Sequence, residues 1–417
     1  MEPNYFTCTL GQAVQYQDGE HYNTVNDLID SKAQTEPSLP VVGFFSPGET
    51  GASWKSHILT FHDVRQGSVI VAEALSTRLG SRPGQTVALL CPSSPDFLFT
   101  WLAIIRLGYS ALLIAPQCSP SAVAHLCRSC DVQFLLYDEI YENLAEKALK
   151  ESSKGTGPPL ESLLLPFSGE DILDVIRRPP PKTTKRPAAV KETDIAYLHH
   201  TSGTSTGVPK PIPQSHRAAV GVLPALDGRK HASFTTTPLY HGGIADLFRA
   251  WTSNALIWLF PGKHLPITAS NVCKCLEAAS SCASKGGPEV KYFSSVPYIL
   301  QMMADDEAGL EHLQRMDIVG VGGAALPEEV GDGLVRDKVN LISRFGSAEC
   351  GFLMSSYRDF EKDQAWQYLR SSPVGEQQQQ PLIFERQEDG LSELVIQPGW
   401  PHMVSLHHGK ISLRLTD

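Results

Sequence analysis

The chain has 417 residues, enough for two or three domains or for one large multilayered unit. Apolar residues make up 42% of the chain and charged residues 19%, which excludes collagen, a coiled coil and wholesale disorder. The formal net charge of −10 argues against non-specific binding to nucleic acid or to anionic membranes, and it leaves room for a local basic pocket.

The N-terminus and the one membrane-like segment favour a cytoplasmic protein. Residues 1–10 lack the basic and apolar regions of a secretory signal peptide. The apolar stretch 97–116 is broken by Arg106 and Gly108. A buried helix that runs into a buried strand therefore explains this stretch better than a membrane span.

The nine cysteines are scattered and odd in number, which favours a reducing compartment. Cys127 and Cys130 form one close pair, and Cys273 and Cys275 form another. Neither pair has a second pair of ligands at zinc-finger spacing. We interpret these cysteines as small buried residues on helices.

The first 150 residues alternate helical and strand-like patterns. Apolar periodicity predicts helices over 64–79, 96–107 and 121–130, and strands over 86–91, 111–115 and 132–137. This alternation is typical of a mostly parallel α/β sheet, and it returns between 194 and 344. The segment 150–191, rich in Pro, Ser and Lys, predicts a surface loop. Short segments at 382–385, 393–397 and 411–415 predict antiparallel strands of a small barrel or sheet.

The most informative motif is a loop rich in Ser, Thr and Gly that follows the strand-like run 195–200. Glycines let backbone N–H groups face an anion, hydroxyl groups donate further hydrogen bonds, and a lysine supplies positive charge. This composition favours a polyphosphate site over a flexible linker. The residues concerned are Thr201, Ser202, Gly203, Thr204, Ser205, Thr206, Gly207 and Lys210.

Three other interpretations of the glycine motifs fail on local chemistry. Residues 203–207 fit the G-x-S-x-G pattern of a hydrolase nucleophile, but Pro209, Pro211 and Pro213 prevent the helix that must follow it. A Walker A loop needs adjacent Gly and Lys, which are separated here. Residues 320–325 match G-x-G-x-x-A, but the Leu-Pro at 326–327 interrupts the dinucleotide-binding pattern.

With these alternatives set aside, residues 201–210 resemble the phosphate-loop signature of the adenylate-forming superfamily, which includes acyl-CoA synthetases, luciferases and adenylation domains of nonribosomal peptide synthetases. The usual form is [ST]-S-G-[ST]-T-G-x-P-K, and this chain carries one extra residue. Five further segments resemble family motifs and occur in family order. They are LTFHDV at 59–64, RLGYSALLIAP at 106–116, PLYHGG at 238–243, GGAALP at 322–327 and FGSAE at 345–349, followed by the terminal Thr-Asp at 416–417.

The resemblance implies an α/β fold, a layered αβαβα core of two α/β subdomains with a small C-terminal β-barrel-like subdomain. We place the first α/β subdomain at 1–190, the second, with the phosphate loop and acyl pocket, at 191–345, and the small β subdomain at 346–417. The implied reaction joins a carboxylate to ATP, giving acyl-AMP and pyrophosphate. ATP and Mg²⁺ are the implied cofactors, and catalysis of such a step consists of positioning and charge neutralisation.

The resemblance also assigns roles to individual residues. Lys210 and the loop before it would hold the β- and γ-phosphates, and Glu349 would bind Mg²⁺. Phe345 would stack on adenine, and Asp417 would bind the ribose hydroxyls. The remaining nucleotide contacts would come from Gly322, Gly323, Ala324, Gly346, Ser347 and Ala348.

The acid would lie near His241, Asp246, Tyr298, Gly322 and Gly346. Amino-acid-activating domains carry an Asp directly after the aromatic residue of the 238–243 segment, and here that position is His241. An ordinary α-amino acid is therefore not the expected substrate. Asp246 fits the first turn of a helix better than a partner for a cationic substrate. Aromatic neighbours such as Trp251 and Phe248 fit an aryl pocket or a cage for a quaternary ammonium, and also fit a plain core.

Two finer details resemble the corresponding sequence of fungal adenylate-forming reductases. They are the Pro-Ile after Lys210 and the opening His-Thr-Ser-Gly at 200–203. Those enzymes add a phosphopantetheine carrier domain and an NAD(P)H reductase domain, which would act in cis on domains outside this chain. The family's C-terminal adenylation subdomain would begin near residue 417, so we expect this sequence to be the large N-terminal core of an adenylation domain. Two alternatives remain: a free-standing acyl-CoA ligase, and a binding core that is nearly inert without its C-terminal subdomain. Partners beyond the small acid and these domains are not expected, neither nucleic acid nor membrane.

Overall fold

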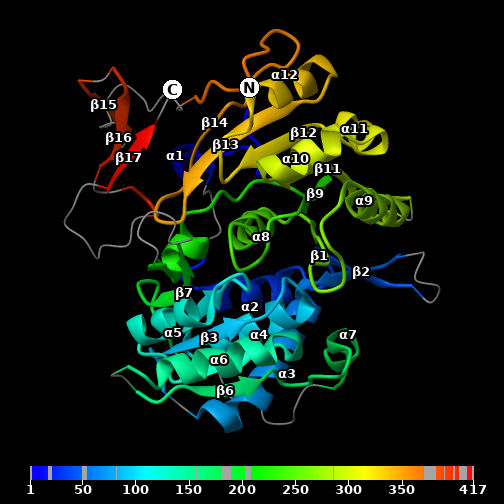
Figure 1. The fold of residues 1–417 in the computed structure, drawn as a ribbon. Coiled ribbons are helices and arrows are strands. Elements are labelled where there is room, and N and C mark those ends of the chain that lie inside the picture. Colours follow the sequence, from blue (N-terminus) through cyan, green and yellow to red (C-terminus); the bar gives the residue numbers. More distant parts are fainter. Residues whose placement is uncertain are drawn as a thin grey trace.

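A computed structural model describes residues 2–16, 21–48, 54–80, 82–155, 158–179, 189–201, 208–284, 286–370, 382–388, 390–397, 400–402 and 411–415. Within them the chain forms three sheets (Figure 1). Two are mostly parallel, and the third is small and antiparallel. The helices pack on both faces of the two larger sheets, as the alternating pattern predicted.

The six-stranded sheet has the order β6-β5-β3-β4-β7-β8, parallel except at the β8 edge. Its strands are β3 (Thr86–Leu90), β4 (Ser110–Ile114), β5 (Phe134–Tyr137), β6 (Glu161–Leu164), β7 (Ile195–His200) and β8 (Pro211–Ser215). The predicted strands at 86–91, 111–115 and 132–137 are confirmed to within two residues at either end. They are buried on both faces, which is why they are continuously apolar.

The eight-stranded sheet has the order β14-β13-β12-β11-β9-β10-β1-β2. Its outermost strands, β14 and β2, run antiparallel to their neighbours, and the other pairings are parallel. Its strands are β1 (Pro40–Pro47), β2 (Trp54–Thr60), β9 (His231–Thr235), β10 (Ile257–Leu259), β11 (Glu289–Ser295), β12 (Ile318–Gly322), β13 (Leu341–Ser347) and β14 (Gly351–Ser355).

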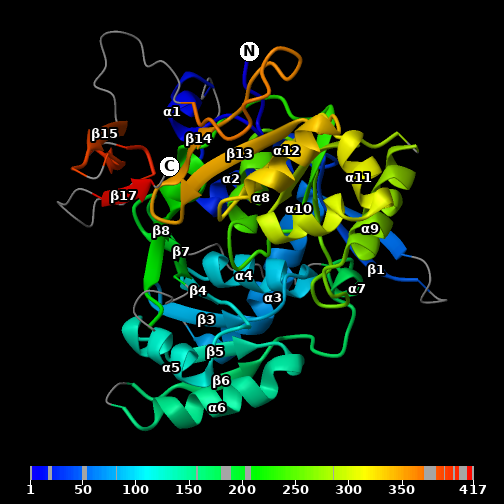
Figure 2. The ribbon, with the colours of Figure 1, turned by 45° about the horizontal axis from the view of Figure 1, so that its top comes forward.

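Helices fill three layers around the two sheets, which gives the αβαβα order (Figure 2). The layer between the sheets holds α2 (Val25–Thr35), α3 (Phe61–Leu79), α4 (Pro95–Arg106) and α8 (Gly243–Thr252). The outer face of the six-stranded sheet carries α5 (Pro120–Ser129) and α6 (Glu142–Ser152). The outer face of the eight-stranded sheet carries α9 (Ala269–Ala283), α10 (Pro297–Ala304), α11 (Glu307–Gln314) and α12 (Glu328–Arg336).

Shorter helical segments complete the chain. They are α1 (Leu10–Ala13), α7 (Ile172–Val175), the 3₁₀ turns η1 (Val14–Tyr16) and η2 (Glu139–Tyr141), and the π-helical turn η3 (Arg217–Gly221). The predicted helices at 64–79, 96–107 and 121–130 correspond to α3, α4 and α5. Each of these three begins after a Ser or Thr whose side chain accepts a hydrogen bond from a backbone N–H of the first turn.

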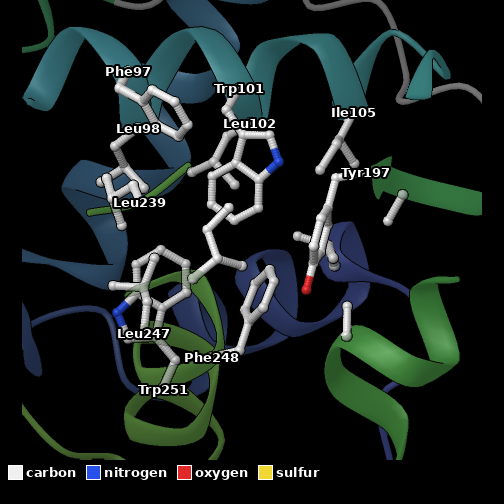
Figure 3. Packing of buried hydrophobic residues seen from close by; sticks show 14 of the residues in the cluster. Phe97, Leu98, Trp101, Leu102, Ile105, Tyr197, Leu239, Leu247, Phe248 and Trp251 are labelled. Carbon is white, nitrogen blue, oxygen red and sulfur yellow. The ribbon is translucent and has the colours of Figure 1, made fainter. Parts of the chain in front are cut away.

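The central layer is held by aromatic side chains from segments far apart in the sequence (Figure 3). Trp101 of α4 lies with its ring centroid 5.3 Å from that of Phe248 and 6.0 Å from that of Tyr197. Trp251 follows one helical turn after Phe248 and donates a hydrogen bond from its indole nitrogen to the backbone carbonyl of Val41. Phe248 and Trp251 are therefore core residues that fix α8, and the aryl-pocket alternative for them is wrong.

The third sheet lies beside β13 and β14 and consists of β15 (Leu382–Arg386), β16 (Ser392–Ile396) and β17 (Ile411–Leu415). The three predicted segments at 382–385, 393–397 and 411–415 form these antiparallel strands. The described residues form an open sheet of three strands, so the barrel-like closure that we expected is replaced by a small sheet. Three strands are too few to close on themselves.

The two large sheets do not follow the boundary at residue 190 that we predicted between the two α/β subdomains. Strands β1 and β2 come from the first part of the chain and pair within the larger sheet, whereas β7 and β8 complete the smaller one. Strand patterns give no long-range pairing partner, so the sequence could not show this exchange. The apolar stretch 97–116 is confirmed as α4 followed by β4. Among the described residues, no helix combines the length and apolar character that crossing a bilayer requires.

Candidate active site

A cavity of about 480 Å³ opens at the carboxyl ends of the parallel strands of the eight-stranded sheet. Ser294 and Ser295 at the end of β11, Gly322 at the end of β12 and the loop after β9 line one side of it. Strand β7 of the other sheet and helix α8 line the rest. Parallel α/β sheets bind ligands at this edge because the loops there diverge and leave room.

Backbone forms one part of the cavity wall, at three glycines that the sequence analysis selected. We call Gly322, Gly323 and Gly346 the glycine wall. Gly323 has φ +83°, a conformation that other residues rarely adopt. A Cβ atom on Gly346 would lie 2.4 Å from the backbone oxygen of Gly351, so the β13–β14 turn itself requires glycine there. Ser347 and Ala348, also selected, line the cavity beside them.

Neutral histidines form a second part of the wall. His241 lies exposed to the cavity at the start of α8, where desolvation by the surrounding protein and the nearby His200 lower its pKa to about 4. Burial lowers the pKa of His199 to about 3 and that of His402 to about 4. The ring of His200 accepts a hydrogen bond from the backbone N–H of Ala115 at Nε2, so its proton lies on Nδ1. At neutral pH these rings carry no charge.

Charged side chains form the third part, which we call the arginine wall: Asp246, Arg249 and Arg344. Asp246 lies in the first turn of α8, as the helix interpretation expected. Its carboxylate also pairs with the guanidinium of Arg344 at 3.0 Å and accepts a hydrogen bond from the Ser294 hydroxyl at 2.7 Å. The charge that could have met a cationic substrate is thus already neutralised by a neighbouring strand.

The phosphate loop lies only partly within the described residues. Ser202, Gly203, Thr204, Ser205, Thr206 and Gly207 lie outside them, as does Asp417. At the two ends of the loop, the Thr201 hydroxyl accepts a hydrogen bond from the backbone N–H of Lys210 at 2.9 Å, and the Thr201 N–H donates to the Lys210 carbonyl. The loop is therefore closed at its base, with the Lys210 side chain exposed to solvent.

Two other selected residues lie near the cavity without lining it. Glu349 is half-buried in the turn between β13 and β14, directly after the lining residue Ala348. Phe345 is half-buried and packs against the central core. Strand alternation explains this position, because Arg344 and Gly346 face the cavity and the residue between them faces away. The phenylalanine ring that lines the cavity among the described residues is that of Phe352 of β14.

The structure separates two selected residues from this cavity. Tyr298 is 72% exposed and lines a different surface depression beside α9, so a role in the acid pocket is not supported. It precedes the well-buried Ile299 and Leu300 on α10, and its side chain takes the opposite, solvent-facing side of that helix. Ala324 is exposed in the loop after β12.

Sequence reasoning missed most of the side chains that give the cavity its character. They include His199, Gln214, Arg249, Ser294, Arg344, Phe352 and His402. Arg344 immediately precedes a recognised motif, and Arg249 lies one turn after Asp246, so spacing could have drawn attention to both. His199, Gln214, Ser294 and Phe352 lie on strands whose pairing partners the sequence does not reveal, and His402 lies in a turn.

Two α/β sheets with helical layers between and outside them, and a cavity at the strand ends, define a fold of the adenylate-forming type. The anthranilate CoA ligase AuaEII is similar, with a TM-score of 0.67 over 92% of this chain and 71% of that chain at 21% identity. The N-terminal subdomain of NpsA from Klebsiella oxytoca is similar with a TM-score of 0.65, over 91% and 88% of the two chains at 15% identity. A profile for AMP-binding enzymes matches residues 33–376, so the chain belongs to the AMP-binding enzyme family.

Among curated relatives, the adenylate-forming reductase stbB of Stachybotrys bisbyi is 25% identical over 78% of this chain and 30% of its own length. The carboxylic acid reductase of Neurospora crassa is 26% identical over 78% of this chain and 31% of its own length. The chain therefore spans about a third of the length of these relatives. It is an adenylate-forming domain similar to those of fungal adenylate-forming reductases.

Proposed function

We propose that this chain activates a carboxylic acid, other than an ordinary α-amino acid, as acyl-AMP. We further propose that the acyl group then passes to a phosphopantetheine carrier and is reduced to an aldehyde with NAD(P)H, on domains outside this chain. The two curated relatives, an adenylate-forming reductase and a carboxylic acid reductase by name, support activation followed by reduction. The observation that carries the proposal is that one cavity is lined both by the glycine wall and by His241 of the acyl segment.

In the proposed reaction, a carboxylate oxygen attacks the α-phosphorus of ATP and pyrophosphate leaves. Two anionic groups must approach each other, so the wall should add hydrogen-bond donors and little negative charge. The neutral ring of His241 supplies a donor without competing for the phosphates. Backbone N–H groups of the glycine wall offer more donors close to the ligand, because no side chains stand in front of them.

Mg²⁺ would be held by Glu349 together with phosphate oxygens, and it would supply charge neutralisation at the phosphates. The fit is reasonable for this ion, because Mg²⁺ is commonly bound through one or two carboxylates plus substrate phosphates. Among the described residues no cluster of three metal ligands occurs, so a dedicated protein cage is not the expected form of the site. Lys210 would add positive charge from the exposed end of the phosphate loop.

The experiment is a pyrophosphate-exchange assay on this chain with ATP, Mg²⁺ and a panel of aryl, aliphatic and cationic acids. Exchange that depends on one class of acid supports the proposal. Addition of CoA tests the ligase alternative, since thioester formation would favour it. Thermal stabilisation by ATP and acid without any exchange would identify a binding core that lacks turnover. Stabilisation by NADPH alone, with none by ATP, would contradict the proposal.

The metal role has its own test in Glu349→Gln, which removes one negative charge and keeps the size of the side chain. We expect acyl-adenylate formation to slow at least tenfold, because a metal-bound carboxylate helps to neutralise the transferring phosphate. Binding of the acid should change little. Glu361→Gln, in an exposed loop, is the matched control. Turnover in Glu349→Gln equal to that of the unaltered chain would show that the metal lies elsewhere.

A further inference from the structure

The arginine wall holds more positive than negative charge. Arg344 of β13 and Arg249 of α8 both line the cavity, and Asp246 is the single carboxylate among the lining residues that the structure describes. The four lining histidines are neutral, because burial lowers the pKa of each. The described wall thus carries a net charge of +1, and the three charged side chains are themselves largely shielded from solvent.

Among the described residues Arg249 forms no ion pair, and the carboxylate of Asp246 acts on its charge only at longer range. It is 4% exposed, and its guanidinium donates through Nη1 to the backbone carbonyls of Tyr5 and Cys8. The Cys8 thiol beside it stays protonated, because burial raises its pKa to about 11. The ring of Phe352 covers the guanidinium at 5.0 Å. A buried guanidinium whose hydrogen-bond partners are all neutral is costly unless a ligand supplies an anion in direct contact.

Arg344 is also left with an unused donor. Its Nη1 donates to the Ser294 hydroxyl at 3.0 Å and its Nη2 to Asp246 at 3.0 Å. Its Nε is buried and has no hydrogen-bond partner among the described residues. The rings of Phe6, at 4.5 Å, and of Phe352, at 4.9 Å, both pack against the guanidinium. The geometry is thus fixed while one N–H remains unsatisfied.

We propose that the acid bound in this cavity is a dicarboxylate, and that its second carboxylate is held by Arg249 and Arg344. This inference rests on the proposed function for the fate of the first carboxylate. A carboxylate suits the wall because the planar guanidinium offers paired N–H donors at matching spacing. Asp246 does not repel it strongly, since Arg344 and Ser294 already hold that carboxylate. The cavity of about 480 Å³ has room for a single-ring or short aliphatic diacid.

The first test needs no variant. Binding of matched pairs, benzoate against terephthalate and hexanoate against adipate, is measured by calorimetry on this chain with Mg²⁺ and a non-hydrolysable ATP analogue. We expect at least one diacid to bind ten times or more tighter than its matched monoacid. Equal or weaker binding of both diacids would overturn the proposal.

The second test locates the preference. Arg249→Met should lower diacid affinity at least tenfold and leave monoacid affinity nearly unchanged, and Arg249→Lys, which keeps the charge, should retain part of the preference. Arg358→Met is the matched control, because Arg358 is also buried and donates to backbone carbonyls but lies outside the cavity. An equal loss for monoacid and diacid in Arg249→Met would contradict the assignment.

The pyrophosphate-exchange assay separates this inference from the proposed function. Exchange with monoacids and no diacid preference would overturn the inference and leave the proposed activity intact. A tenfold diacid preference in binding without exchange for any acid would support the inference and count against the activity.

Discussion

The glycine wall and the arginine wall face the same cavity but are built in opposite ways. Gly322, Gly323 and Gly346 present backbone, and each lies in a short motif that can be recognised from a few adjacent letters. The arginine wall depends on side chains from α8 and β13, 98 residues apart in the sequence, that meet only after the sheet has formed. A local motif therefore reveals where a backbone can approach a ligand, whereas the charge of a pocket is a tertiary property.

The arginine wall should be the more fragile of the two. Arg344→Met leaves the partly buried Asp246 carboxylate without its ion-pair partner, so we expect the free energy of unfolding to fall by about 3 kcal/mol. Urea unfolding followed by circular dichroism measures it. Arg344→Met/Asp246→Asn should recover much of the loss, because both members of this ion pair are then removed together.

The control for that experiment is Arg229→Met. Arg229 pairs with Glu36 and Asp227 at the surface, and its loss should change the unfolding free energy by about 1 kcal/mol or less. Equal destabilisation by Arg344→Met and by the double variant would show that Arg344 and Asp246 are not coupled.

Acid should destabilise the fold through histidines that are buried in the neutral form. His216, 2% exposed, accepts a hydrogen bond from the Val25 N–H at Nδ1, and burial lowers its pKa from 6.5 to about 4. Its contribution is fully present above pH 6.5. Below pH 6.5 this histidine is protonated in the unfolded chain but remains neutral in the folded chain. The free energy of unfolding therefore falls by about 1.4 kcal/mol per pH unit towards pH 4.

The measurement is urea unfolding at pH 7, 6 and 5 for the unaltered chain and for His216→Gln, whose amide can still accept the bond from Val25. The variant should lose less stability between pH 7 and pH 5, by about 1.4 kcal/mol or more. His402 and His199 on the cavity wall act in the same direction in both proteins and cancel in the comparison. Parallel pH profiles would show that His216 does not resist protonation.

The glycine wall can be tested without changing any charge. A methyl group at Gly346 would lie 2.4 Å from the Gly351 oxygen, which is a backbone atom and cannot move aside cheaply. We expect Gly346→Ala to lower the free energy of unfolding by about 1–3 kcal/mol and to weaken ATP binding. Gly333→Ala is the control, since its Cβ meets nothing within 4 Å and α12 favours alanine. Unchanged stability and ATP binding in Gly346→Ala would mean that the turn can rearrange.

The sequence predicted those features of the fold and of the site that depend on neighbouring residues, and it missed those that depend on distant ones. Helix α3 was predicted over 64–79 from nearby residues alone, and it begins three residues earlier, at Phe61 after the capping Thr60. The doubly buried strand β3 was also predicted from nearby residues, over 86–91. The exchange of strands between the two sheets did not, because continuously apolar strands carry no information about their neighbours. In the site, the glycines and His241 were found by motif. Arg249 was missed because, in the sequence of an amphipathic helix, a buried arginine cannot be told from a polar residue on the solvent-exposed face of that helix.

The smallest expected effect is a change in acid selectivity. The variants that test it compare a residue near the acid with a residue near the ATP phosphates. His241 lines the cavity next to the arginine wall, whereas Lys210 lies exposed at the end of the phosphate loop. His241→Ala removes a neutral donor near the acid, so we expect the order of preferred acids to change by about tenfold, or about 1.4 kcal/mol, with ATP affinity nearly unchanged. Lys210→Ala should instead weaken ATP binding and lower exchange for every acid by the same factor, because the phosphates are common to all.

His62→Ala, at an exposed histidine on α3, serves as the control. The measurement is a pyrophosphate-exchange profile over monoacids and diacids for each variant. A proportional loss for all acids in His241→Ala would move His241 from the acid to the nucleotide, and the arginine wall alone would then have to account for selectivity.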